Sequence, residues 1–208
     1  MTEQKIQVNK EHYFSDNYNH KARWLSFFYQ IKLLKKFQPQ NILEIGPGNG
    51  WTTRILRDLN FNVKTVDIDK DLSPDYVAGV ENLPLEDNSF DVVCAFEVLE
   101  HLSFDKFASN LKEMARVSKK YLIISLPDHR RILFHLLLKM PFINYKNIFF
   151  KIPSFKKHVF DGQHYWEIGK KGYSVSKIKE EIAKSGMKIV ESFVPSDAPT
   201  NHYFVIEK

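Results

Sequence analysis

Cysteine is almost absent from this chain. The single Cys94 lies in the apolar run DVVCAF, so no internal disulfide can form, and its neighbours predict a buried strand residue rather than a nucleophile. A reducing compartment suits such a chain. The polar N-terminus MTEQKIQVNK also has no apolar signal core. We therefore expect a cytoplasmic protein.

Long apolar runs are missing as well. The longest stretch, residues 132–143, is broken by His135, Lys139 and Pro141. It falls short of the ~18 apolar residues that a membrane span needs. Acidic residues are fewer than basic ones, 25 against 30, and the net charge is +5. This mild excess suits an anionic partner such as nucleic acid or phospholipid, and it suits a lysine-rich surface equally well.

Strand and helix patterns alternate along most of the 208 residues, a length that suits one α/β domain spanning 1–208. An N-terminal helical segment at 1–38 precedes the first strand. Apolar runs predict strands at 41–45, 62–66, 76–78, 90–96, 121–127, 187–194 and 202–208. Helical spacing predicts helices at 18–37, 51–59, 104–118 and 174–185. This order predicts a mostly parallel sheet with right-handed crossovers, and the last two strands are expected to pair antiparallel.

The strongest motif is ILEIGPGNG at residues 42–50. An apolar strand ends in Glu44 and runs into a turn with three glycines, and a second strand ends in Asp67. A glycine turn followed about 20 residues later by a strand-end carboxylate is typical of a site for a cofactor that carries a ribose. An acid ahead of the glycines would repel a pyrophosphate, so the spacing favours a cationic ligand over a dinucleotide.

These residues resemble the class I S-adenosylmethionine-dependent methyltransferases of the type 11/23 group, over residues 40–127. The resemblance implies a methyltransferase with a Rossmann-like three-layer α/β sandwich, whose seven-stranded sheet has its last strand antiparallel. It implies S-adenosylmethionine as the cofactor. The methionine side would be lined by Glu44, Gly46, Pro47, Gly48 and Gly50, and the ribose would be held by Asp67 and Ile68.

The adenine subsite departs from the family pattern. The family often has an aspartate in the loop after the third strand, and here Gly79 stands at that position. Glu81 or Asn82 would serve instead, with Leu83 on the adenine face, or a backbone carbonyl would take the role.

The fourth strand ends in FEVLEHL at 96–102, a second family-like motif. Phe96 and Glu97 are expected to line the cofactor pocket, whereas Glu100 and His101 suit a helix start equally well. The spacing E-x-x-E-H also resembles the small-RNA 3′-end 2′-O-methyltransferases and the quinone-biosynthesis O-methyltransferases. By that resemblance, a divalent metal would be held by Glu97, Glu100, His101 and the downstream His164 of HYWE.

Methyl transfer to a hydroxyl is helped by a base, and histidine titrates in the right range. His101 and His164 are the predicted catalytic residues because of their motif contexts. His129 and His158 are weaker candidates, and His135 lies in an apolar run that favours a structural role.

The segment 128–167 is expected to cover the acceptor as a helical insert after the fifth strand, rich in aromatic and basic residues. Three interpretations of its surface stay open. It is a lid packed on the domain, a surface for a membrane or lipid-linked substrate through 128–160, or, with less weight, a nucleic-acid surface.

The sequence therefore favours a methyltransferase acting on a small molecule, glycan or lipid-linked acceptor, with oxygen as the expected atom. The alternatives are an RNA 2′-O-methyltransferase that uses the metal, and a cofactor-binding partner protein without catalysis. The intact Glu44, glycine turn and Asp67 argue against the last.

Overall fold

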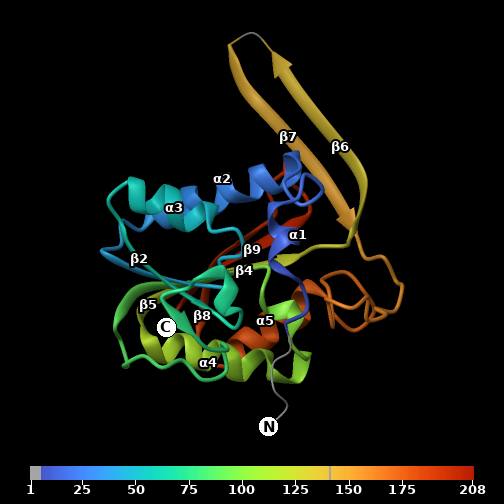
Figure 1. The fold of residues 1–208 in the computed structure, drawn as a ribbon. Helices are drawn as coiled ribbons and strands as arrows, with labels where there is room; N and C mark the ends of the chain where they lie inside the picture. The colour runs from blue at the N-terminus through green and yellow to red at the C-terminus, as the bar shows by residue number, and fades with distance from the viewer. Residues whose placement is uncertain (1–5, 141) are drawn as a thin grey trace.

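A seven-stranded sheet forms the centre of the chain in the computed structural model, which describes residues 6–140 and 142–208 (Figure 1). The strand order is β3-β2-β1-β4-β5-β9-β8. The strands are β1 (Asn41–Ile45), β2 (Asn62–Asp67), β3 (Tyr76–Val77), β4 (Phe90–Phe96), β5 (Ser118–Pro127), β8 (Lys188–Phe193) and β9 (Asn201–Glu207). The pairs formed by β1 to β5 are parallel, and β9 runs antiparallel to both of its neighbours. The predicted Rossmann-like sheet with an antiparallel last strand is confirmed.

Helices cover both faces of this sheet (Figure 1). One face carries α2 (Lys21–Lys36) and α3 (Trp51–Asp58), and the other carries α4 (Phe107–Val117) and α5 (Val175–Lys184). Ile42 packs toward α2 and α3, whereas the next residue, Leu43, packs toward α4 and α5. Side chains alternate between the faces of a strand. The continuous apolar runs of β1 and β4 are therefore what a strand buried on both faces requires.

The remaining elements are short. They are α1 (Lys10–Phe14) and the 3-10 turns η1 (Lys70–Leu72), η2 (Leu99–His101) and η3 (Phe104–Lys106). The predicted N-terminal helical segment thus contains two helices, α1 and α2. Residues 1–5 of that prediction lie outside the described residues.

The helical insert predicted at 128–167 is wrong. Residues 131–152 form an antiparallel hairpin of β6 (Arg131–Met140) and β7 (Ile143–Ile152), and 153–173 follow as a loop. The sequence RILFHLLLKM has no 3.6-residue period, and INYKNIFFKI is rich in the β-branched and aromatic residues that suit strands. Neither segment has an acid with which its lysines could form the i,i+4 pairs that support an exposed helix.

The loop after the hairpin returns to the core through Trp166. This side chain is fully buried, packs edge-on against Phe104 and Phe107, and donates from Nε1 to the Leu102 carbonyl at 3.0 Å. The loop is therefore fixed beside η2 and η3, at the carboxyl end of β4. Among the described residues, no helix is long and apolar enough to cross a membrane.

Candidate active site at the carboxyl end of the sheet

Three parallel strands end side by side at the glycine turn. Ile45 of β1 is paired with Val66 of β2 and with Ala95 of β4. The residues that follow, Gly46, Asp67 and Phe96, therefore lie at the same edge of the sheet. Open α/β sheets bind their ligands at this edge.

The turn itself requires glycine. Gly46 and Gly48 have φ of 66° and 56°, a left-handed conformation that other residues rarely adopt. A Cβ at Gly46 would lie 2.5 Å from Cγ2 of Val98. The Gly46 amide donates to the Val66 carbonyl at 2.8 Å, and the Gly50 amide donates to the Pro47 carbonyl at 2.9 Å. These bonds hold the turn against β2 and start α3 at Trp51.

Glu44 is buried below this turn. Its carboxylate accepts a hydrogen bond from Oγ1 of Thr53, the third residue of α3. Burial raises the pKa of Glu44 to about 7, against the opposing effects of that hydrogen bond and of the Arg57 charge. The predicted lining of the methionine side by Glu44 stays a prediction, and the structure gives this residue a second role in joining β1 to α3.

Asp67 has no cationic partner among the residues that the structure describes. Its Oδ1 accepts the Asp69 amide at 2.9 Å, and the backbone of Ile68 also hydrogen-bonds to this carboxylate. Burial, together with the charge of Asp69, raises the pKa of Asp67. A carboxylate that is partly buried without a cation suits the hydrogen-bonding hydroxyls of a ribose.

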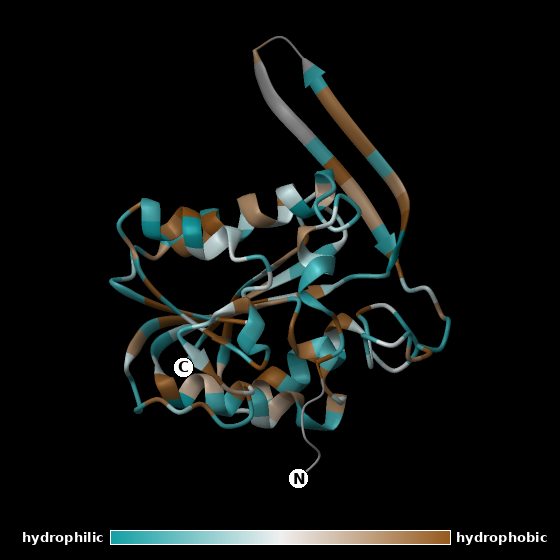
Figure 2. Ribbon diagram, in the orientation of Figure 1, coloured by the Kyte–Doolittle hydropathy of each residue, from teal (hydrophilic) through white to brown (hydrophobic). Residues whose placement is uncertain are grey.

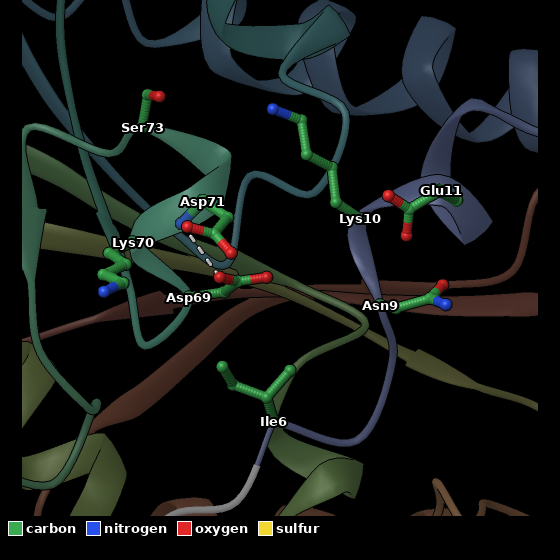
Figure 3. Close-up of a pocket in the computed structure, with 8 residues that line it drawn as sticks. All are labelled: Ile6, Asn9, Lys10, Glu11, Asp69, Lys70, Asp71 and Ser73. Carbon is green, nitrogen blue, oxygen red and sulfur yellow. Dashed lines mark hydrogen bonds between the residues drawn. The ribbon is translucent and has the colours of Figure 1, made fainter.

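A cleft of about 530 Å³ opens beside the loop that follows Asp67 (Figure 3). One wall comes from the loop with Asp69 and η1, and the other from the N-terminal segment. The lining residues are Ile6, Asn9, Lys10, Glu11, Asp69, Lys70, Asp71 and Ser73. Its volume falls within the range of small-molecule sites.

The N-terminal segment lies over the glycine turn. A Cβ at Gly48 would lie 3.2 Å from two ring atoms of Tyr13. Asn49 Nδ2 donates to the Asn19 side chain at 3.0 Å, and Gln7 Nε2 donates to the His101 carbonyl at 3.0 Å. The cover of the turn is thus built by residues 7–19, which the sequence motifs did not indicate.

The residues predicted for the adenine subsite differ in burial. Glu81 and Asn82 are exposed in the loop after β3. Leu83 is buried in the core, and its amide donates to Oε1 of Glu113 at 2.8 Å. Their contact with an adenine stays a prediction.

Glu97, directly after β4, has an unusual backbone conformation. Its φ is 57°, which costs free energy in a residue with a side chain and is common near functional sites. Arg23 of α2 forms an ion pair with Glu97 at 2.8 Å, and Asn201 donates a hydrogen bond to it. The Arg23 guanidinium also lies 4.4 Å from the ring centroid of Tyr18. Phe96, the residue directly before Glu97, is buried.

Glu100, His101 and His164 come together as the sequence predicted. One donor atom from each lies within 4.8 Å of the others. Glu97 lies outside this group, because Arg23 and Asn201 hold its carboxylate. Three of the four predicted metal ligands thus lie together, and their binding of a metal stays a prediction.

The two histidines of this group have opposite pKa shifts. Burial and the nearby His164 charge lower the pKa of His101 to about 4. Burial also opposes protonation of His164, but the hydrogen bond from its Nδ1 to Glu167 at 2.9 Å and the Glu100 charge raise its pKa above the ordinary value. Groups with separated pKa values in one site suit acid and base roles.

Glu167 organises this part of the site. It is buried and faces three imidazoles, with His129 Nε2 at 3.1 Å, His164 Nδ1 at 2.9 Å and His158 Nδ1 at 3.4 Å. Burial opposes ionisation of Glu167, but the hydrogen bonds from His129 and His164 hold its pKa well below the usual range. The only sequence signal for Glu167 is its i,i+3 spacing from His164 in HYWE.

Comparison with known proteins agrees with this architecture. Residues 43–124 match the family model described as a methyltransferase domain. An uncharacterized protein of Methanocaldococcus jannaschii is 27% identical over 184 residues, which cover 83% of this chain and 77% of that protein.

Solved structures have the same fold. The 1,6-didemethyltoxoflavin-N1-methyltransferase of Burkholderia thailandensis, with bound S-adenosylhomocysteine, superposes with a TM-score of 0.64 at 16% identity, covering 95% of this chain and 84% of that one. The magnesium protoporphyrin IX methyltransferase of Synechocystis, also with bound S-adenosylhomocysteine, gives 0.61 at 13% identity, covering 90% and 84%. In its glycine turn and strand order this chain has the fold of these methyltransferases, and residues 43–124 are similar to the methyltransferase-domain model.

Proposed function

We propose that this protein binds S-adenosylmethionine between the glycine turn and Asp67 and transfers its methyl group to a small-molecule, glycan or lipid-linked acceptor. The observation that carries the proposal is the alignment of Gly46, Asp67 and Phe96 at one sheet edge, with Asp67 free of any cationic partner among the described residues. Two of the structural neighbours were solved with S-adenosylhomocysteine bound, which supports the same cofactor here.

The residues present fit this cofactor. The glycine turn lets a ligand approach the backbone, and Asp67 offers an oxygen to a ribose hydroxyl. The cleft beside Asp69 opens where the nucleoside end would lie. When bound, the cofactor supplies the methyl group, and the protein orients the acceptor toward it.

Oxygen is the proposed acceptor atom, because His101 and His164 lie close together at this edge. A neutral His101 accepts a proton readily only from an acidic hydroxyl, whereas His164 is oriented by Glu167. The neighbours named above are methyltransferases of 1,6-didemethyltoxoflavin and of magnesium protoporphyrin IX, which supports a small acceptor.

The test of the cofactor is calorimetric titration with S-adenosylmethionine, with Asp67→Ala as the variant. Loss of hydrogen bonds to a charged group costs about 1.5–3 kcal/mol, so we expect affinity to fall by about 10- to 100-fold. Asp58→Ala, at an exposed aspartate at the end of α3 outside the cleft, is the matched control and should bind within a few-fold of wild type. Absence of binding to the wild-type protein would refute the proposal.

A metal-assisted O-methyl transfer is the second candidate, with an RNA ribose 2′-hydroxyl as its proposed acceptor. Glu100 has 0% exposure, and neither of its carboxylate oxygens has a hydrogen-bond partner in the described structure. The Nδ1 atoms of the histidines are engaged, by Gln7 and the Gln163 carbonyl at His101 and by Glu167 at His164. Metal-binding histidines commonly have such outer partners on the second ring nitrogen.

Glu100, His101 and His164 would hold this metal. A divalent ion there would lower the pKa of an acceptor hydroxyl. Calorimetry with Mn²⁺ and Zn²⁺ tests the site, with Glu100→Gln as the isosteric variant and Glu113→Gln as a control outside the group. Equal metal affinity in wild type and Glu100→Gln would exclude the site, and label transfer into RNA would then separate the two candidate functions.

A further inference from the structure

The hairpin of β6 and β7, residues 131–152, extends away from the domain and is called the hairpin arm below (Figure 1). Figure 2 shows β6 as mostly hydrophobic along its length. Cross-strand pairs fix which residues share a face. Phe134 is opposite Phe150 and Leu136 is opposite Ile148, whereas the alternate pair Leu137 and Asn147 lies on the other face.

Apolar side chains are exposed on both faces of the hairpin arm. Phe134, Leu136, Ile148 and Phe150 are exposed on one face, and Leu137, at 59%, is exposed on the other. Leu133, at the bulge between Ile132 and Phe134, is exposed as well. At the tip, Phe142 is fully exposed. A soluble domain seldom exposes a continuous apolar patch of this kind unless it binds something there.

The charged residues of the hairpin arm are all basic. Between residues 129 and 160 the chain has no Asp or Glu, and its cations are Arg130, Arg131, Lys139, Lys146, Lys151, Lys156 and Lys157. Arg130 and Lys151 pair with Asp128 at the base of the arm. The excess of basic over acidic residues in this part of the sequence favours an anionic partner and disfavours a second arm of the same charge.

We propose that the hairpin arm docks the protein on an anionic phospholipid surface, with the tip around Phe142 in the interfacial layer. A folded partner covers one face of a two-stranded ribbon, whereas a lipid surface surrounds the tip on both faces. Basic residues flanking an apolar tip match the headgroup charge. This inference goes beyond the proposed function and does not depend on it.

The depth of docking is limited by the backbone. The outer edges of a two-stranded ribbon leave N–H and C=O groups unpaired, and such groups do not enter the hydrocarbon core. Interfacial segments reach about 5–10 Å into the boundary. At about 3.3 Å per residue, this depth takes in only the last two or three residues of each strand.

The test is co-sedimentation with vesicles of phosphatidylcholine with and without phosphatidylserine. The variant is Leu138→Asp/Phe142→Asp, and the matched control is Leu59→Asp/Val190→Asp, which makes the same charge change at exposed apolar residues outside the arm. We expect wild type and control to bind the anionic vesicles at low salt and to be released by high salt. The arm variant should bind at least about tenfold more weakly.

Three results would overturn the inference: no binding to anionic vesicles, equal binding to neutral ones, or equal loss in the control. Sedimentation equilibrium provides a further outcome, because a dimer that the arm variant abolishes would assign the arm to a second copy. Thermal melting and S-adenosylmethionine titration of both variants keep the result separate from folding and from cofactor binding.

Discussion

Burial of the Glu44 carboxyl lowers the free energy of unfolding at neutral pH. A carboxyl whose pKa is about 7 in the fold and 4.5 in the unfolded chain is protonated in the native state over a range in which the unfolded state is ionised. Below pH 4.5 both states are protonated and the penalty is absent. The free energy of unfolding therefore decreases as pH rises from about 4.5 to about 7, and the full penalty remains above that range.

Glu44→Gln is expected to remove this pH dependence. The variant should gain stability relative to wild type between about pH 5 and pH 8, by on the order of 3 kcal/mol at most. Urea unfolding at about pH 5 and about pH 8 measures how the free energy of unfolding differs between the variant and wild type. Glu180→Gln, at an exposed glutamate on α5, controls for the loss of one carboxylate. A Glu44→Gln difference that does not vary with pH would contradict the buried, protonated carboxyl.

At the scale of elements, α1 depends on the glycine turn for its position. It has five residues and none is buried, so its own hydrogen bonds do not hold it in place. The ring of Tyr13 against Gly48 and the Asn49 side-chain bonds to Tyr13 and Asn19 supply the contact with the domain. A change in the turn should therefore act on α1.

Gly48→Ala is expected to loosen α1, because the new Cβ would press against the ring of Tyr13. The positive φ at this position also makes alanine unfavourable. Gly50→Ala is the matched control, since Gly50 has a similar φ of 71° but nothing within 4 Å of an added Cβ. The backbone strain should lower the free energy of unfolding of both variants by about 1–2 kcal/mol. Hydrogen exchange in residues 10–14 should increase in the first variant only, and equal increases would show that Tyr13 does not transmit the change.

The elements also show where sequence reasoning succeeds and where it fails. The run FDVVCAF predicted β4 because a strand buried on both faces must be continuously apolar. The hairpin arm was predicted as helical because an apolar run without a period suits either structure. The Arg23–Glu97 ion pair joins residues far apart in the chain, and no local pattern indicates such a contact.

For the whole molecule, stability is expected to be distributed unevenly. The sheet is covered by helices on both faces, whereas the hairpin arm has no covering layer, and an isolated two-stranded hairpin is marginal in water. Regions with few buried apolar contacts open locally, below the cost of global unfolding.

Native-state hydrogen exchange measures this difference. Amides of β6 and β7 should exchange at low denaturant, while those of β1, β4 and β5 should exchange only near the unfolding transition. The arm variant Leu138→Asp/Phe142→Asp should leave the exchange of the β1, β4 and β5 amides unchanged. Arm amides as slow as those of the sheet would mean that something covers the arm in solution.

The two ends of the hairpin arm leave the domain next to each other, since Arg131 is paired with Ile152. A segment whose ends are neighbours can be lengthened, shortened or exchanged without moving the strands of the central sheet. The arm is thus a module on which selection can act separately from the sheet. Its transfer to another protein of this fold, between the fifth strand and the following loop, would transfer this apolar and basic surface and leave the sheet unchanged.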